Sequence, residues 1–278
     1  MRQDLAILYH CPQLTFLHLD LFIQSNIGIQ LLGLTLAGLP CLKSLTLKAM
    51  MSEEEWPTLV PVAFFSCSGK LVDFVIRFVY DDGNYGELPE WNEEDLFDDG
   101  ELEEVRGRLL PAVQEGGLPP LPHRQQPLQN LTTFFVNVMD TLTLAQIQSI
   151  FEHCPGLVSF VIPQLHSVID PRALAHFIAE HCPQIQKIDH YRGNTDNQLA
   201  LDLMALLPPN TVKDLTIIQF DKDWAELIPI VGRHKASLQS VDFVRCCRFI
   251  SAKVQEDVFG QCPQLEMLKL DIDPYTAR

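Results

Sequence analysis

A triplet of apolar positions, apolar-x-x-apolar-x-apolar, recurs nine times along the 278-residue chain. The nine copies begin at Leu14, Leu42, Leu71, Leu131, Leu157, Ile185, Val212, Leu238 and Leu265. Consecutive copies start 26 to 29 residues apart, except that 60 residues separate the third copy from the fourth. Self-similarity at a period of roughly 20 to 50 residues indicates stacked repeats that share one core. The pattern therefore predicts a solenoid, which offers a long binding surface rather than a single pocket.

Residues 143–162 show the repeating unit most clearly. Thr143 is a suitable helix cap, and apolar residues follow it on one face of a predicted helix. These residues are Ile147, Ile150, Phe151 and Cys154. Pro155 ends the helix because proline has no amide hydrogen to donate. The triplet that follows then alternates in the manner of a strand. By the same reasoning, further helices are expected to start near Ser52, Asp170, Thr195, Asp221 and Ser251.

Such units predict an α/β fold, a leucine-rich-repeat solenoid in the form of a horseshoe arc. Parallel strands, about 4.8 Å apart, would form the concave face, and helices, about 9 Å apart, the convex face. We expect repeats at residues 1–80 and 127–278. Residues 81–126 read as an acidic, proline-rich and largely irregular insertion. Neither end of the array shows a polar capping unit, which predicts a segment of a longer array or a shortened gene product.

Charge is concentrated in the insertion. Residues 81–104 contain twelve of the 36 acidic residues and no Lys or Arg, which leaves 24 acids against 20 bases elsewhere. The net charge of −16 argues against nucleic acid or an anionic membrane surface as the main partner. The longest uncharged run, residues 21–42, is interrupted by polar residues and Pro40, so its apolar part is short of the ~20 residues that span a bilayer.

The cysteines recur at one position of the repeat. Cys11, Cys154, Cys182 and Cys262 each lie three residues before a triplet, which predicts small buried side chains rather than disulfides. A reduced compartment, the cytoplasm or the nucleus, follows as the expected location. His153 and His181 precede two of these cysteines, so a zinc site is geometrically conceivable, but capping of the helix C-termini is the favoured role of both histidines.

Catalytic motifs are absent from the sequence. It contains no glycine-rich phosphate loop, zinc-protease helix or Gly-x-Ser-x-Gly elbow, so we expect no enzyme, no metal and no cofactor. Cys246 and Cys247 are expected to be structural. The segment 119–124 fits a polyproline ligand, a pattern that also arises by chance in proline-rich loops.

Four segments share a His/Gln-Cys-Pro turn before the triplet: His10–Leu14, His153–Leu157, His181–Ile185 and Gln261–Leu265. They resemble the leucine-rich repeats of F-box proteins, especially the fungal ones. Residues 238–246 are similar to the cysteine-containing repeat subtype. The resemblance implies a role in substrate recognition for ubiquitin ligases. The chain opens directly in a repeat helix, so a cullin-ligase adaptor is implied as a partner only for a longer product with an F-box.

The candidate binding surface is the predicted concave face. In each strand, the residue between the second and third apolar positions points outward, as does the residue after the third. From these positions, the predicted protein-binding residues are Arg77, Phe135, Asn137, Val161, Asp189, Tyr191, Asp242, Val244 and Lys269. His190, which occupies a third apolar position, is expected to be a hydrogen-bonded core residue. The sequence therefore predicts recognition of another protein, a possible ubiquitination target. The alternative is a regulatory or scaffolding repeat protein unrelated to ubiquitination.

Overall fold

The structure is a computed structural model of residues 1–278. It describes residues 8, 11–22, 26–50, 56–79, 126–139, 142–163, 165, 169–190, 197–218, 220, 223–246 and 252–272. The expected insertion at 81–126 lies outside these ranges, apart from Gln126.

The strands form one nine-stranded sheet in which every neighbouring pair is parallel and the spatial order follows the chain. They are β1 (Phe16–Phe22), β2 (Ser44–Met50), β3 (Asp73–Phe78), β4 (Thr133–Val136), β5 (Ser159–Ile162), β6 (Lys187–His190), β7 (Asp214–Ile218), β8 (Ser240–Cys246) and β9 (Met267–Ile272). The described helices are α2 (Asn26–Ala37), α3 (Trp56–Ser66), α5 (Leu144–Phe151), α6 (Pro171–His181), α7 (Gln198–Leu206), α8 (Trp224–His234) and α9 (Ala252–Phe259). Strands and helices alternate, which confirms the predicted α/β class.

The register of the sheet follows the sequence repeat. The second apolar residue of each triplet faces that of the next strand. The row reads Leu17, Leu45, Phe74, Phe134, Phe160, Ile188, Leu215, Val241 and Leu268. A register slip by one residue would turn every apolar side chain to the opposite face, so the triplets fix the pairing. The prediction that all nine triplets form neighbouring parallel strands is confirmed.

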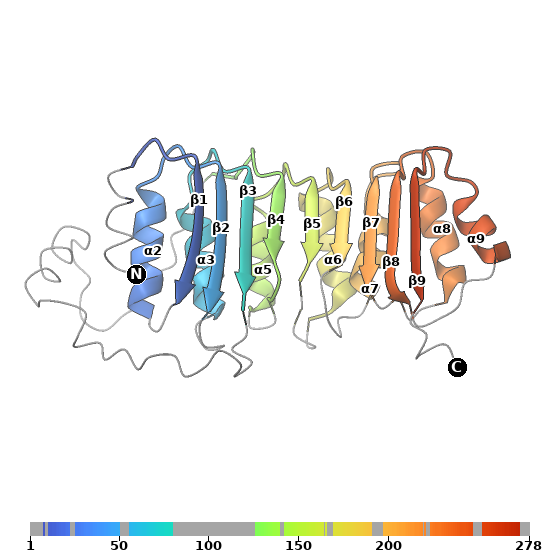
Figure 1. The fold of residues 1–278 in the computed structure, drawn as a ribbon, viewed down its shortest axis with the longest axis horizontal. Helices are drawn as coiled ribbons and strands as arrows, with labels where there is room; N and C mark the ends of the chain where they lie inside the picture. The colour runs from blue at the N-terminus through green and yellow to red at the C-terminus, as the bar shows by residue number, and fades with distance from the viewer. Residues whose placement is uncertain are drawn as a thin grey trace, which may run out of the picture.

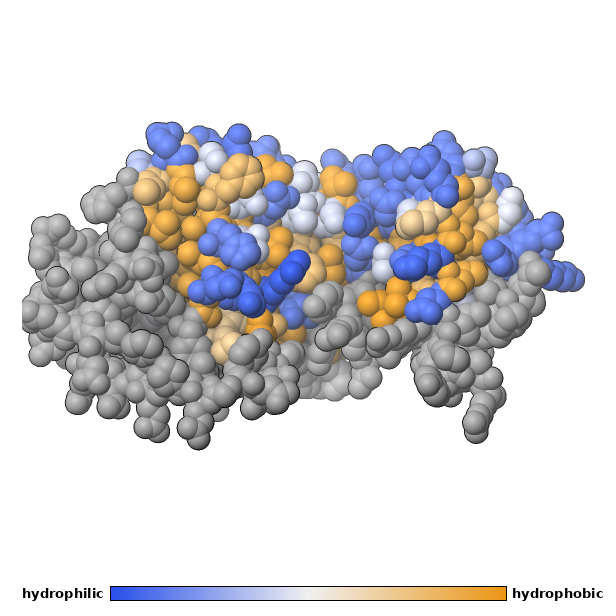
Figure 2. Space-filling view, viewed as in Figure 1, coloured by the Kyte–Doolittle hydropathy of each residue, from blue (hydrophilic) through white to orange (hydrophobic). Residues whose placement is uncertain are grey.

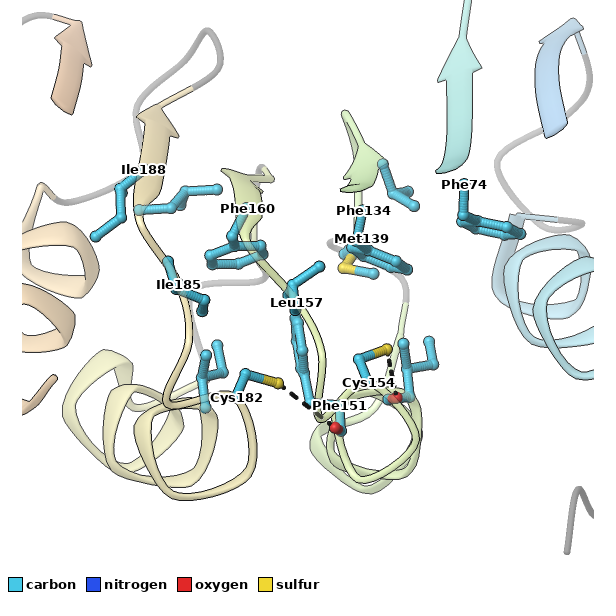
Figure 3. Close-up of a cluster of buried hydrophobic side chains, with 14 of the residues drawn as sticks. Phe74, Phe134, Met139, Phe151, Cys154, Leu157, Phe160, Cys182, Ile185 and Ile188 are labelled. Atoms are coloured by element: carbon cyan, nitrogen blue, oxygen red, sulfur yellow. Dashed lines mark hydrogen bonds between the residues drawn. The ribbon is translucent and has the colours of Figure 1, made fainter. Parts of the chain in front are cut away.

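The helices cover one face of the sheet. In Figure 1 they lie behind the central strands and to the outside of the strands at both ends of the row. The triplet side chains that the structure describes point into the layer between sheet and helices, where they form one continuous core. In its centre, Phe74 stacks on Phe134 with 5.5 Å between the ring centroids, and Phe151 from α5 meets Phe134 edge-on (Figure 3). Neighbouring repeats thus supply one another's interior.

Strand β4 pairs with β3 as closely as consecutive repeats do elsewhere. Phe74 faces Phe134 in the same register as the other pairs, although 60 residues separate the two in sequence. On the helical side, α3 contacts α5 directly. The described stack therefore continues directly from β3 to β4, although residues 80–125 lie between the two strands in sequence.

Helix starts agree with the capping signals. Thr143 accepts a hydrogen bond from the Gln146 amide, and the Gln146 side chain accepts one from the Thr143 amide, so the pair forms a capping box. Asp170 caps α6 ahead of Pro171. The N-caps of α7 and α8 are Asn197 and Asp223, each two residues after the expected caps Thr195 and Asp221. The expected caps Ser52 and Ser251 lie outside the described residues.

The cysteines before the triplets are buried in three of the four units. Cys154 and Cys182 are fully buried, and their thiols donate to the carbonyls of Ile150 and Phe151 (Figure 3). Cys262 is also buried. Cys11, however, is exposed, so its predicted burial is wrong. The reason is its place beside β1, the first strand, where the described residues include no repeat on the outer side to cover it.

None of the described helices combines the length and apolar character needed to cross a lipid bilayer.

Candidate functional site

One face of the sheet points away from the helices, and we call it the open face. In Figure 1 the strands lie in front of the helices, so Figure 2, seen from the same side, looks onto this face and shows polar side chains interspersed with apolar ones. Its first row is Phe16, Ser44, Asp73, Thr133, Ser159, Lys187, Asp214, Ser240 and Met267. The second row is His18, Thr46, Val75, Phe135, Val161, Asp189, Thr216, Asp242 and Lys269. The third row includes Asp20, Lys48, Arg77, Ile218, Val244 and Asp271.

Two of the predicted site residues meet in the N-terminal half of the open face. The guanidinium of Arg77 on β3 lies over the ring of Phe135 on β4, 5.4 Å from its centroid. Such a cation–π contact contributes about 0.5–1 kcal/mol at an exposed site. Arg77 remains exposed, and the aromatic ring holds its planar donor group in one orientation. The pair offers a cationic group already placed for an acidic partner.

Two polar side chains contact the carboxylate of Asp20 on β1. The Lys48 ammonium lies 3.7 Å from its carboxylate, and the His18 imidazole lies 3.1 Å from it. All three side chains are at least half exposed, so neither contact is worth more than about 1 kcal/mol to the fold. Charges at this end of the open face are therefore available to a ligand.

The C-terminal half of the open face carries carboxylates paired with lysines. Asp189 and Lys187, both on β6, are 3.1 Å apart, and Asp242 on β8 accepts a hydrogen bond from Lys269 on β9 at 3.2 Å. Thr216 lies between the two carboxylates in the sheet register. The second oxygen of Asp242, Oδ1, is buried, and the described residues offer it no hydrogen-bond partner. This half of the face thus carries both acidic and basic groups, and each of these two carboxylates contacts a lysine.

Two predicted site residues are not on the surface. Asn137 is buried, and its side chain accepts a hydrogen bond from the Phe78 amide at 2.7 Å and donates one to the Phe78 carbonyl at 3.0 Å. The prediction of a surface role is wrong because β4 ends at Val136, after which strand alternation no longer applies. Val161 is also buried, at 8% exposure, although it lies in the second row of the open face. Asn137 instead ties the end of β3 to the chain after β4.

Of the remaining predicted site residues, Val244 lies within the described part of the chain and Tyr191 does not. Val244 is half-buried on β8, where it faces Ile218 of β7. Tyr191 lies outside the described residues, and so does the side chain of His190, so the predictions for both remain open.

Sequence reasoning missed the first row of the open face. Phe16 is 69% exposed and Met267 is 47% exposed, and Lys187 is exposed as well. The signal was present, because period two places the residue before each second apolar position on the same side as the predicted rows. Extending the alternation by one step toward the N-terminus would have found it.

His153 and His181, the two histidines of the conceivable zinc site, form hydrogen bonds within the protein. The His153 imidazole donates to the Ser149 carbonyl at 2.7 Å, and the His181 imidazole donates to the Phe177 carbonyl at 2.9 Å. Both therefore satisfy carbonyls of the last helical turn, as predicted for histidines at helix C-termini. Among the described residues, no group of three or more His, Cys, Asp or Glu side chains is arranged to hold a metal ion.

Compared with known proteins, the sequence matches no protein-family model and no curated protein.

Proposed function

We propose that this chain is a leucine-rich-repeat solenoid that binds another protein through the open face, in the manner of the substrate-binding part of F-box ubiquitin-ligase receptors. The observation that carries the proposal is a parallel sheet with its described helices on one face only. All-parallel sheets are otherwise found almost always with both faces covered, because their strands are rich in apolar residues. A parallel face nine strands wide that no described helix covers is therefore a surface for a ligand.

The side chains on the open face favour a protein as that ligand. They come from nine separate strands, so they spread over a broad area instead of converging on a small molecule. Exposed Phe16 and Met267 and the Arg77–Phe135 pair belong to residue types enriched at protein interfaces. The charged groups of the open face add specificity because a partner must present complementary charges.

The proposal is tested by comparing what wild-type protein and surface variants capture from cell extract. The double variant R77A/F135A removes the oriented guanidinium and its supporting ring from the open face. The matched control, E226A/I228A, alters two exposed residues of α8 on the helical side. We expect quantitative mass spectrometry to show proteins that the wild type and the control retain and the open-face variant loses. Circular dichroism establishes that all three proteins are folded.

Identical capture by R77A/F135A and wild type would contradict binding through this part of the face. The connection to ubiquitination is tested on the proteins captured by wild type. If the chain acts in substrate recognition, their abundance rises when the chain is depleted from cells. An unchanged abundance favours the regulatory or scaffolding alternative.

A further inference from the structure

The last strand, β9, ends the described sheet with an uncovered core. Its triplet residues Leu265, Leu268 and Leu270 are only half-buried, whereas Val241 in the same row as Leu268 is fully buried. Helix α9 packs on α8 and leaves the outer edge of β9 without a neighbour among the described elements. A free strand edge of this kind is a template for pairing with another chain.

The sequence of β9 is complementary to itself when read in the opposite direction. If two copies run antiparallel with Leu270 opposite Leu270, Lys269 of each copy lies opposite Asp271 of the other. Residues directly opposite each other in an antiparallel pair point to the same face. The two Leu270 side chains would therefore join the cores, and both Lys269–Asp271 pairs would lie on the open face. Asp271 is exposed and has no ion pair with another described residue.

We propose that two copies of this chain form a symmetric dimer by antiparallel pairing of their β9 strands, with the two-fold axis at Leu270. The pairing continues the sheet from one copy into the next and covers the half-buried leucines of both. Because opposite residues share a face, the two open faces lie on the same side of the joined sheet. The dimer is a separate property from ligand binding, and either can fail without the other.

Charge opposes the head-to-tail alternative. If β9 paired in parallel with β1 of a second copy and continued the row from Leu268 to Leu17, Asp271 would lie opposite Asp20. Like charges directly opposite each other destabilise a strand pair. Such pairing would also add copies without end, because it leaves a free edge at each extremity of the assembly.

A charge exchange on β9 tests the proposed register. Sedimentation-velocity ultracentrifugation of the full chain over a range of concentrations gives its mass in solution. We expect the wild type to have twice the mass of a single chain at high concentration. The variant D271K places a lysine opposite Lys269, and K269E places a glutamate opposite Asp271, so both single variants should be monomeric. The double variant K269E/D271K restores opposite charges and should dimerise again.

Two controls separate dimerisation from other effects of these variants. K48E reverses a charge of the open face on an interior strand and should leave the mass unchanged. D242N removes the contact with Lys269 inside one copy without altering β9, and should also dimerise. A wild type that stays monomeric at the highest concentration overturns the proposal. So does a dimer that is indifferent to D271K, or growth into open-ended assemblies.

Discussion

The imidazole of His234, at the end of α8, donates its Nε2 hydrogen to the carbonyl of Met204 on α7 at 2.7 Å. Its other nitrogen, Nδ1, faces the backbone amides of Thr211 and Val212 at 3.3 and 3.4 Å and accepts from them. Only the neutral ring has this combination of one donor and one acceptor. The side chain is fully buried, and burial lowers its pKa; the hydrogen bond to Met204 opposes this shift, and the nearby Arg233 adds to it.

The stability of the protein should therefore depend on pH through His234. Below about pH 6.5 the unfolded chain binds a proton at this histidine, while the folded chain resists until its lowered pKa is reached. The free energy of unfolding should fall as the pH drops through this window, by up to about 1.4 kcal/mol per pH unit. Above pH 6.5 this group adds no dependence.

The measurement is urea denaturation of wild type and His234→Gln between pH 5 and 7.5. The glutamine amide keeps a donor and an acceptor but does not titrate in this range. We expect the variant to be less stable near pH 7 and to lose less stability on acidification. Equal losses in both proteins would show that other groups cause the pH dependence.

Asn137→Ala should destabilise the fold by about 1–3 kcal/mol, because it removes two buried hydrogen bonds to the backbone of Phe78. Chemical denaturation gives the difference. Asn130→Ala is the matched control, since Asn130 is exposed and donates one hydrogen bond to the Gly69 carbonyl. It should cost about 1 kcal/mol or less. If the two variants lose equal stability, the buried contact has no special role.

Phe134→Ala should be among the most damaging single changes, at about 3–5 kcal/mol, because it empties a fully buried site at the centre of the aromatic cluster. Its ring contacts Phe64, Phe74 and Phe151 and so links the repeat that contains β3 with the repeat that contains β4. Phe16→Ala, on an exposed ring, should change stability by no more than about 0.5 kcal/mol. Thermal and urea unfolding compare the two. A small effect at Phe134 would show that the core adapts around the cavity.

Cys182 should resist alkylation in the native protein. Burial raises the pKa of its thiol to about 12, so almost none of the reactive thiolate forms at pH 8, and the core excludes the reagent. Cys41, which is partly exposed, serves as the internal comparison. Peptide mapping after iodoacetamide treatment should find Cys41 modified and Cys182 protected until denaturant is added. Modification of both at equal rates would indicate that the repeat opens readily.

The architecture could be predicted from the sequence because the apolar triplet recurs nine times. Each triplet gains its buried position from the neighbouring triplets, so a single misplaced residue does not alter the prediction. His190 replaces the third apolar residue of its triplet, yet β6 still forms and pairs with β5 and β7 as the triplets predict. The starts of α5 and α6 were predicted correctly because Thr143 and Asp170 accept hydrogen bonds from the first amides of their helices.

The candidate site was less readable, because exposure depends on where each strand stops. Asn137 follows the alternation of β4 on paper, but the strand ends one residue earlier and the side chain turns inward to Phe78. The Arg77–Phe135 contact joins strands that are far apart in sequence, and alternation alone does not set the rotamers that bring the two side chains together. His234 escaped notice since its role requires the exact approach of α7 to α8.

The direct pairing of β3 with β4 has a practical consequence. Residues 80–125 connect Val79 to Gln126 in sequence, yet Phe74 still faces Phe134 as in an unbroken stack. In a repeat array each unit contacts only its neighbours, so an added segment at the joint between two units need not disturb the stack. This joint is accordingly a natural place to graft a fluorescent or enzymatic reporter, with both halves of the scaffold left in register.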